Sequence, residues 1–127
     1  MTELQFRQII NDNPTLTTHG FGVDEGASFA KERKALYGCY REALVGEIFL
    51  RQCKRTEKTF WRSSTYNLKH LAEAYAKHQE LQPTYIREGA FIVAGIHLGF
   101  KMKPWGASTS VSLNISKKTK IDGIRVD

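Results

Sequence analysis

The sequence has little cysteine, and this scarcity limits the classes of fold that it can adopt. Of its 127 residues only Cys39 and Cys53 are cysteines, and they form no C-x-x-C pair. Small disulfide-rich domains and zinc ribbons need several cysteines at short, regular spacings. We therefore exclude a disulfide framework and a zinc ribbon, and we expect two reduced, mostly buried thiols.

The sequence also lacks an apolar run long enough to cross a membrane. Its longest apolar run, from Gly89 to Phe100, covers about a dozen residues, whereas a transmembrane helix needs roughly 20. The first residues, MTELQFRQIINDNP, show no basic stretch followed by an apolar one, as a secretory signal would require. We expect no membrane partner, and a cytoplasmic location is the default expectation.

Recognisable catalytic and cofactor motifs are missing as well. The four histidines show no H-E-x-x-H or His-x-His spacing, so a metal site is not expected. The glycine-rich segment GFGVDEG lacks the Lys-Ser ending of a phosphate-binding loop and carries two acidic residues where the phosphate would lie. There is no G-x-S-x-G motif and no paired-carboxylate signature. We expect no catalytic residues, no cofactor and no enzyme activity.

Acidic residues are scarce in the second part of the chain. Residues 1–53 contain 6 Lys and Arg against 7 Asp and Glu, whereas residues 54–127 contain 13 against 6. The formal net charge of +6 therefore comes from the second part alone. A basic surface of this kind is typical of proteins that bind polyanions, because phosphates neutralised by Lys and Arg release counterions. The alternative is that the excess charge only keeps the domain soluble.

Apolar periodicity predicts the elements of the second half. Residues 63–79 place apolar side chains at helical spacing, namely Leu68, Leu71, Ala72, Tyr75 and Ala76. Residues 84–98 are apolar on every side of the helical wheel, which predicts a helix that is buried all round. Alternating apolar residues on both sides of a Trp-Gly turn then predict a β-hairpin over residues 100–116.

These segments predict a single α+β domain, mainly helical, with three principal helices followed by a C-terminal β-hairpin. Within residues 1–127 we expect an N-terminal arm and Gly-rich loop (1–26, a short helix or strand followed by a loop), a long helix (27–53), a helix pair (63–79 and 84–98), the hairpin (100–116) and a basic tail (117–127). The order of elements is that of a winged helix, with the hairpin as the wing. A homodimer formed through the long helix, whose apolar stripe is rich in aromatics, is a further hypothesis.

The preferred functional hypothesis is DNA binding, most simply to a duplex, through the basic second part. The candidate contacts are Lys69, His70, Lys77, Arg87, Lys101, Lys103, Trp105, Lys117 and Lys118. The third helix offers only His97 to base edges beyond its first turn, so we expect contacts between a basic wing and the phosphate backbone to dominate.

The alternative hypothesis is a non-enzymatic protein-interaction module. Its candidate interface anchors are Phe60, Trp61 and Trp105, because aromatic side chains carry much of the binding energy at protein interfaces. Phe60 and Trp61 also lie between Lys58 and Arg62, an arrangement that suits base stacking with cations on the nucleic-acid backbone. A third interpretation makes this aromatic pair part of the core.

Two blocks, SSTYNLKHLAEAY and YIREGAFIVAGIHLGF, are followed by a hairpin that ends in SLNIS. This pattern resembles one found in small uncharacterised proteins of bacterial plasmids, phages and conjugative elements, and it covers about half of the chain. The resemblance implies a compact helix-plus-hairpin domain and a mobile-element setting, in which an interaction module would act as an inhibitor of a host defence complex. It implies no particular activity and no catalytic residues.

Overall fold

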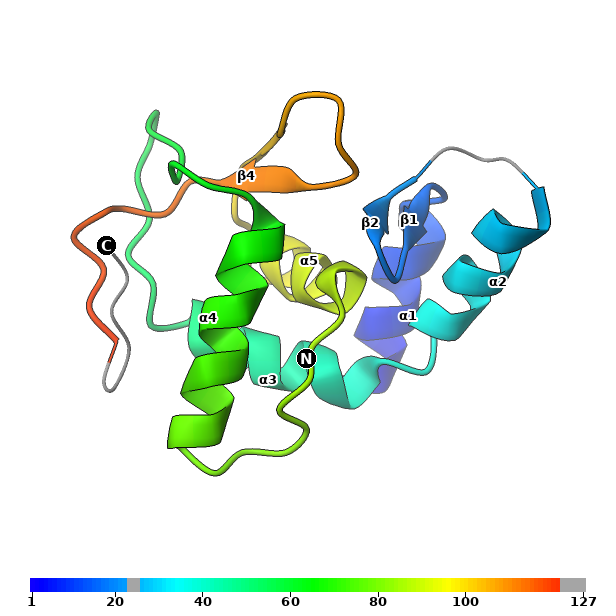
Figure 1. The fold of residues 1–127 in the computed structure, drawn as a ribbon, viewed down its shortest axis with the longest axis horizontal. Helices are drawn as coiled ribbons and strands as arrows, with labels where there is room; N and C mark the ends of the chain where they lie inside the picture. Colours follow the sequence, from blue (N-terminus) through cyan, green and yellow to red (C-terminus); the bar gives the residue numbers. More distant parts are fainter. Residues whose placement is uncertain (23–25, 122–127) are drawn as a thin grey trace.

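The computed structural model describes residues 1–22 and 26–121. This part of the chain contains five helices: α1 (Glu3–Asp12), α2 (Gly26–Leu36), α3 (Tyr40–Leu50), α4 (Thr65–His78) and α5 (Glu88–His97) (Figure 1). It also contains two antiparallel hairpins, β1 (Leu16–Thr17) with β2 (Gly20–Phe21), and β3 (Met102–Pro104) with β4 (Val111–Leu113). The predicted α+β class is confirmed, but the prediction of three principal helices and one hairpin gave too few elements.

Helix α5 lies at the centre of the molecule, with α1, α3 and α4 packed around it (Figure 1). Its residues from Glu88 to Gly95 are all buried. A Cβ atom on Gly46 of α3 would lie 3.3 Å from the Phe91 ring, so this glycine allows the two helices to approach closely. The predicted buried helix is confirmed, although it begins at Glu88 rather than at residue 84.

The single long helix predicted over residues 27–53 is wrong. Helix α2 ends at Leu36 and α3 begins at Tyr40, and the three residues between them have amides that bond to carbonyls only three positions earlier. Such tightened bonds are typical of the last turn of a helix, and Gly38 in the middle lowers helix propensity further. The break turns α3 so that it runs beneath α5, and Tyr37 and Tyr40 pack against the core. Part of the aromatic stripe invoked for a homodimer is therefore packed within the chain, whereas Ile48 of α3 is 42% exposed.

Helix α1 lies within the segment that was predicted as an arm and loop. Thr2 caps it, because its hydroxyl accepts a hydrogen bond from the Gln5 amide while the Gln5 side chain accepts one from the Thr2 amide. This reciprocal pair is a capping box, a signal that is visible in the sequence as Thr-Glu-Leu-Gln. The helix buries Phe6 and Ile10 completely against the core. Parts of the predicted Gly-rich loop and basic tail, residues 23–25 and 122–127, lie outside the described residues.

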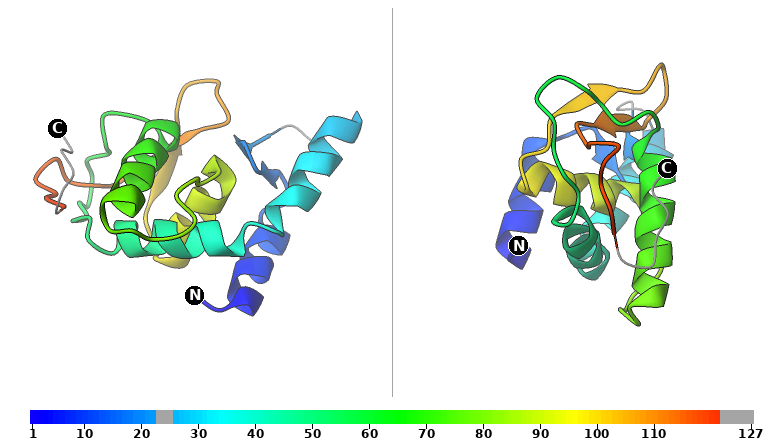
Figure 2. Two further views of the ribbon diagram at one scale, coloured as in Figure 1. Left: turned by 60° about the horizontal axis from the view of Figure 1, so that its bottom comes forward. Right: turned by 90° about the vertical axis from the view of Figure 1, so that its left-hand side faces the viewer.

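The C-terminal hairpin occupies the predicted residues, and β4 is its inner strand. On one side β4 pairs with β3, from Met102 opposite Leu113 to Pro104 opposite Val111. On its other side residues 54–61 run alongside the chain that continues from it, with the Trp61 amide 2.7 Å from the Leu113 carbonyl. Figure 2 shows this segment beside the hairpin.

The two hairpins are joined to the buried helix by backbone contacts. The Gly89 amide, in the first turn of α5, donates to the Thr18 carbonyl at 3.0 Å, and the Phe21 amide donates to the Thr109 carbonyl at 2.8 Å. These bonds place the turn between β3 and β4 close to the N-terminal hairpin. None of the helices in residues 1–22 and 26–121 is both long and apolar enough to span a bilayer.

Candidate nucleic-acid interface

Three basic segments come together around β4. We call residues 54–62, 101–103 and 116–120 the basic surface. Together they contain nine Lys or Arg residues and one acidic residue, Glu57. All nine basic side chains belong to exposed residues: Lys54, Arg55, Lys58, Arg62, Lys101, Lys103, Lys117, Lys118 and Lys120. Main-chain hydrogen bonds hold the segments together, for example from the Ser116 amide to the Lys54 carbonyl at 2.8 Å.

Within residues 1–22 and 26–121, most of this positive charge has no carboxylate beside it. Among the described residues, the basic surface makes one ion pair, between Lys101 and Glu57 at 3.4 Å, and both partners are exposed. An exposed pair of this kind is screened by water and contributes little. The charge of the surface is therefore largely uncompensated.

Several of these cations lie on aromatic rings instead. The Lys103 ammonium lies 4.9 Å from the centroid of the Phe60 ring, and the Arg62 guanidinium lies 5.7 Å from that of Trp61. Arg55 lies 4.3 Å from the ring of Phe100. A cation on a ring keeps its charge, so these contacts orient the side chains without neutralising them.

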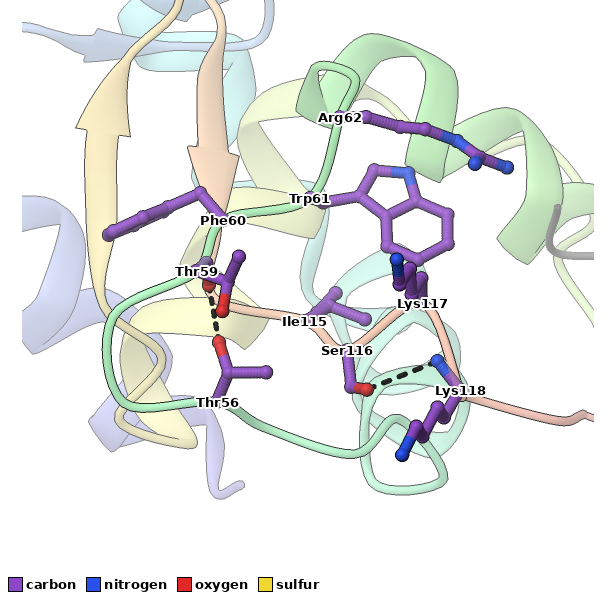
Figure 3. A pocket seen from close by; sticks show the side chains of 9 residues that line it. All are labelled: Thr56, Thr59, Phe60, Trp61, Arg62, Ile115, Ser116, Lys117 and Lys118. Atoms are coloured by element: carbon purple, nitrogen blue, oxygen red, sulfur yellow. Dashed lines mark hydrogen bonds between the residues drawn. The ribbon is translucent and has the colours of Figure 1, made fainter.

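A hollow of about 380 Å³ opens in the basic surface (Figure 3). Phe60 and Trp61 point to opposite sides of their segment, as neighbouring residues of an extended chain do. Trp61 is only 5% exposed, and its carbonyl accepts a hydrogen bond from the Ser112 hydroxyl at 2.6 Å. Lys117 and Lys118 line the rim. Trp61 is thus part of the core, as one of the three interpretations held, whereas Phe60 is half-buried beneath Lys103.

Lys69, His70 and Arg87 lie in a second cavity, of about 470 Å³. We call it the tyrosine pocket and define it by Tyr66, Lys69, His70, Tyr85, Arg87 and Glu88. It lies where the first half of α4 meets the start of α5 and the turn before β4. The structure therefore brings together three of the nine predicted contacts, but away from the basic surface.

Lys69, one of the candidate DNA contacts, is buried at the edge of the core rather than exposed. Its residue is 6% exposed, and its ammonium lies 3.4 Å from a carboxylate oxygen of Glu73. Lys69 follows Leu68 and lies one turn after Thr65, both of which are fully buried, so it falls at the edge of the buried stripe of α4. Its ammonium also lies beside the rings of Tyr66 and Tyr85.

Arg87 is held by Glu42 of α3. Its Nη1 donates to Glu42 Oε2 at 2.6 Å, and its backbone amide donates to the other oxygen at 2.7 Å. Burial alone would lower the pKa of Arg87, but the carboxylate of Glu42 outweighs this and raises it. The guanidinium is therefore charged at any accessible pH and fixed at one side of the tyrosine pocket.

The remaining predicted contacts lie in different places. The basic surface contains four of them: Lys101, Lys103, Lys117 and Lys118. Trp105 lies in the turn between β3 and β4, and its side chain is 40% exposed. Lys77 is exposed in the last turn of α4 and belongs to neither cluster. Sequence reasoning missed Lys54 and Arg55 as partners of the hairpin, as well as the exposed Tyr66. The charge of the segment KRTEKTFWR was visible in the sequence, but its pairing with the chain after β4 was not.

Helix α5 presents no recognition face. Its first eight residues are buried, and Ile96 and His97 after them are only half-exposed. A major-groove recognition helix needs several exposed polar side chains. Base contacts from the body of this helix are therefore ruled out by its position in the core.

The two cysteines are free and buried, as the sequence predicted. Burial raises the pKa of Cys39 to about 11 and that of Cys53 to about 12. Both thiols are protonated at neutral pH, which makes them poor nucleophiles. Among the residues that the structure describes, no group of three His, Cys, Asp or Glu side chains is arranged to hold a metal ion.

Comparison of the chain with protein-family models, with curated proteins and with solved structures finds no match. Any assignment of function must therefore come from the surface and the pocket themselves.

Proposed function

We propose that the chain binds nucleic acid, most simply DNA, through the basic surface. The observation that carries the proposal is the convergence around β4 of the three segments of the basic surface, which contain nine exposed Lys and Arg residues against one acidic residue. A phosphate backbone neutralised by such a surface releases its condensed counterions, which drives binding regardless of sequence. Uncompensated charge is what this mechanism requires, because a cation already paired with a carboxylate gains less from a phosphate.

The mode of binding follows from what is exposed. The body of α5 is buried, so contacts come from the segment 54–62, the β3–β4 hairpin and the residues after it. The hairpin follows α5 in the chain order of a wing, and Trp105 in its turn suits contact with a groove or a base. This arrangement favours contacts to the backbone over the reading of base sequence.

The protein-interaction alternative is less well supported by the same residues. Trp61 is 5% exposed and Phe60 is half-buried beneath Lys103, so two of the three proposed anchors are already packed within the chain. Interface anchors carry energy when they fill a pocket of the partner. Trp105 alone has the exposure that such a role needs.

The proposal is tested by a double charge reversal, Lys117→Glu with Lys118→Glu. The matched control is Lys31→Glu with Lys34→Glu, which makes the same change of charge on exposed residues of α2, at the opposite end of the molecule from the basic surface (Figure 1). Affinity for a labelled duplex of about 20 base pairs is measured by fluorescence anisotropy at low salt. We expect the first variant to bind about 30-fold more weakly, because it loses phosphate contacts, and the control to change about threefold at most.

Two results would contradict the proposal. In one, both double variants lose the same affinity, which would mean that only net charge matters. In the other, the unmodified chain fails to bind DNA even at low salt. Circular dichroism of each variant shows whether its fold is retained.

A further inference from the structure

The tyrosine pocket has exposed aromatic walls. Tyr66 is 51% exposed and Tyr85 is 59% exposed, although large aromatic side chains usually bury most of their surface. The Lys69 ammonium lies 5.5 Å from the centroid of the first ring and 5.2 Å from that of the second, so the two rings flank one cation. The His70 ring meets Tyr66 edge-on at 4.7 Å. These contacts hold both tyrosines in place while leaving part of each ring open.

A carboxylate lies at the floor of this pocket. Glu88 is 6% exposed, and its Oε2 accepts a hydrogen bond from the Thr65 hydroxyl at 2.6 Å. Within residues 1–22 and 26–121, no donor reaches the second oxygen of Glu88, Oε1. Every fully buried side-chain oxygen and nitrogen that the structure describes has a hydrogen-bond partner, so Oε1 is not fully buried. Oε1 is therefore open to the pocket and is able to accept a hydrogen bond there.

Two cations at the side of the pocket keep donors to spare. Lys69 makes one long bond to Glu73, at 3.4 Å, and an ammonium has three protons to donate. In the guanidinium of Arg87, Nη1 donates to Cys39 and Glu42. Within the described residues, Nε and Nη2 have no hydrogen-bond partner. These donors suit a phosphate, which guanidinium groups bind through paired hydrogen bonds.

We propose that the tyrosine pocket binds one unpaired nucleotide whose base carries an exocyclic amino group. The base stacks on Tyr66 or Tyr85, its amino group donates to Glu88 Oε1, and its phosphate lies at Lys69 and Arg87. The cavity, about 470 Å³, is in the range of sites that bind small ligands. Thymine and uracil fit this pocket less well, because their ring N–H lies between two carbonyl oxygens that the carboxylate repels.

If the nucleotide is part of a longer strand, the proposal for the tyrosine pocket rests on the proposed function, which is nucleic-acid binding by the basic surface. Ser110 lines the tyrosine pocket and Ser116 lines the hollow of the basic surface, at opposite ends of the same extended segment. The two serines are six positions apart, so the distance between them is at most about 20 Å. A single strand of about six stacked nucleotides covers the same distance. A strand held on the basic surface can thus place one unstacked base in the pocket.

The test compares two labelled single strands of the same length, decadeoxycytidylate and decadeoxythymidylate, by fluorescence anisotropy. These bases have the same ring size but differ in the amino group. We expect the unmodified chain to bind the cytosine strand about tenfold more tightly, because one good base contact gives roughly this discrimination. Glu88→Gln should abolish the preference, and Tyr85→Ala should weaken binding of the cytosine strand about tenfold.

Controls separate the pocket from the fold and from the basic surface. Tyr85 is exposed, so its truncation leaves the core intact even if Glu88→Gln impairs folding. His78→Ala removes an exposed ring from the end of α4 and should change the affinity for neither the cytosine nor the thymine strand. Equal binding of both strands, together with no effect of Tyr85→Ala, would overturn the pocket and leave the basic surface standing.

Free cytidine monophosphate distinguishes the two sources of the nucleotide. Titration of this compound into the chain is followed by calorimetry, with Tyr85→Ala as the control. Binding that Tyr85→Ala abolishes would identify a free nucleotide as a ligand, even if no strand binds and the proposed function fails. A cytosine preference without binding of the free compound would assign the pocket to nucleic acid. Failure of both the strand preference and the free compound would overturn the proposal.

Discussion

The two ends of the segment that contains β4 carry positive charge in different ways. At the end with Ser116, the lysines and arginines of the basic surface are exposed, and within the described residues only Lys101 has a carboxylate partner. At the end with Ser110, both cations of the tyrosine pocket are paired: Lys69 with Glu73, and Arg87 with Glu42. The first end holds charge in solvent, and the second holds it in fixed geometry.

This difference separates attraction from recognition. Unpaired charges act over roughly 10 Å at moderate ionic strength and weaken as salt rises. Paired and partly buried cations add little long-range attraction, but they hold hydrogen-bond donors at defined positions. We expect the basic surface to supply affinity and the tyrosine pocket to supply selectivity.

The largest predicted effect is a loss of fold stability from a substitution at the pocket end alone. A Cβ atom on Gly89 would lie 1.9 Å from the Thr17 carbonyl oxygen, so Gly89→Ala must push the start of α5 away from the N-terminal hairpin. We expect a loss of more than about 4 kcal/mol in the free energy of unfolding, measured by urea denaturation. Gly38→Ala is the control, because its nearest neighbour would be the Ala35 carbonyl at 3.4 Å. Equal stability of the two variants would contradict the close packing described here.

A smaller effect tests whether the hairpin turn extends the basic surface. Trp105 is 40% exposed, so Trp105→Ala should change the free energy of unfolding by less than about 0.5 kcal/mol. If the ring stacks on a base, its loss should weaken binding of single-stranded DNA about fivefold. Anisotropy titration of this variant beside the unmodified chain measures the effect. Unchanged affinity would confine the interface to the lysines and arginines.

The smallest predicted effect is a change in fold stability at acid pH, and it again distinguishes the two ends. A hydrogen bond from the Thr18 hydroxyl, aided by His19, lowers the pKa of Glu32 below its usual 4.5. A lowered folded-state pKa stabilises the fold above pH 4.5, and this contribution is lost as the pH falls through the folded value.

Thermal melts of the unmodified chain and of Glu32→Gln test this pH dependence. The variant should melt at a lower temperature at neutral pH, and the two melting temperatures should converge as the pH falls through the lowered pKa of Glu32 and the carboxylate becomes protonated. Thr18 and His19 both line the tyrosine pocket, so the change belongs to that end. A difference that stays constant from pH 7 to pH 3 would show that the carboxylate charge has no part in it.

Local patterns in the sequence were enough to predict several elements. Helix α4, the buried helix α5 and the C-terminal hairpin follow from apolar spacing, which is set by contact with a core. A short helix or strand was expected before the Gly-rich loop, and the capping box at Thr2 and Gln5 could have identified it as helix α1. The break between α2 and α3 was harder to predict, because the apolar spacing continues through it and Gly38 alone does not fix where a helix ends.

The arrangement of the candidate site depends on contacts between distant residues. The segment 54–61 bonds to chain nearly 60 residues later, for example from the Asn114 side chain to the Thr56 carbonyl at 2.7 Å. No periodicity announces such a pairing. The burial of Lys69 beneath Tyr66 and Tyr85 likewise depends on how the segment before α5 folds over α4. Charge counts alone placed the positive half of the chain correctly but could not divide it into a surface and a pocket.

The most direct test of the central claim is the salt dependence of DNA binding by the unmodified chain. Affinity for a labelled duplex is measured at several salt concentrations and plotted as the logarithm of the binding constant against the logarithm of salt. We predict a straight line with a slope of about −4 or steeper, since each phosphate contact contributes about −0.9 and the basic surface offers more than enough cations for five. A flat line, or no binding at the lowest salt, would contradict the claim that the basic surface binds nucleic acid.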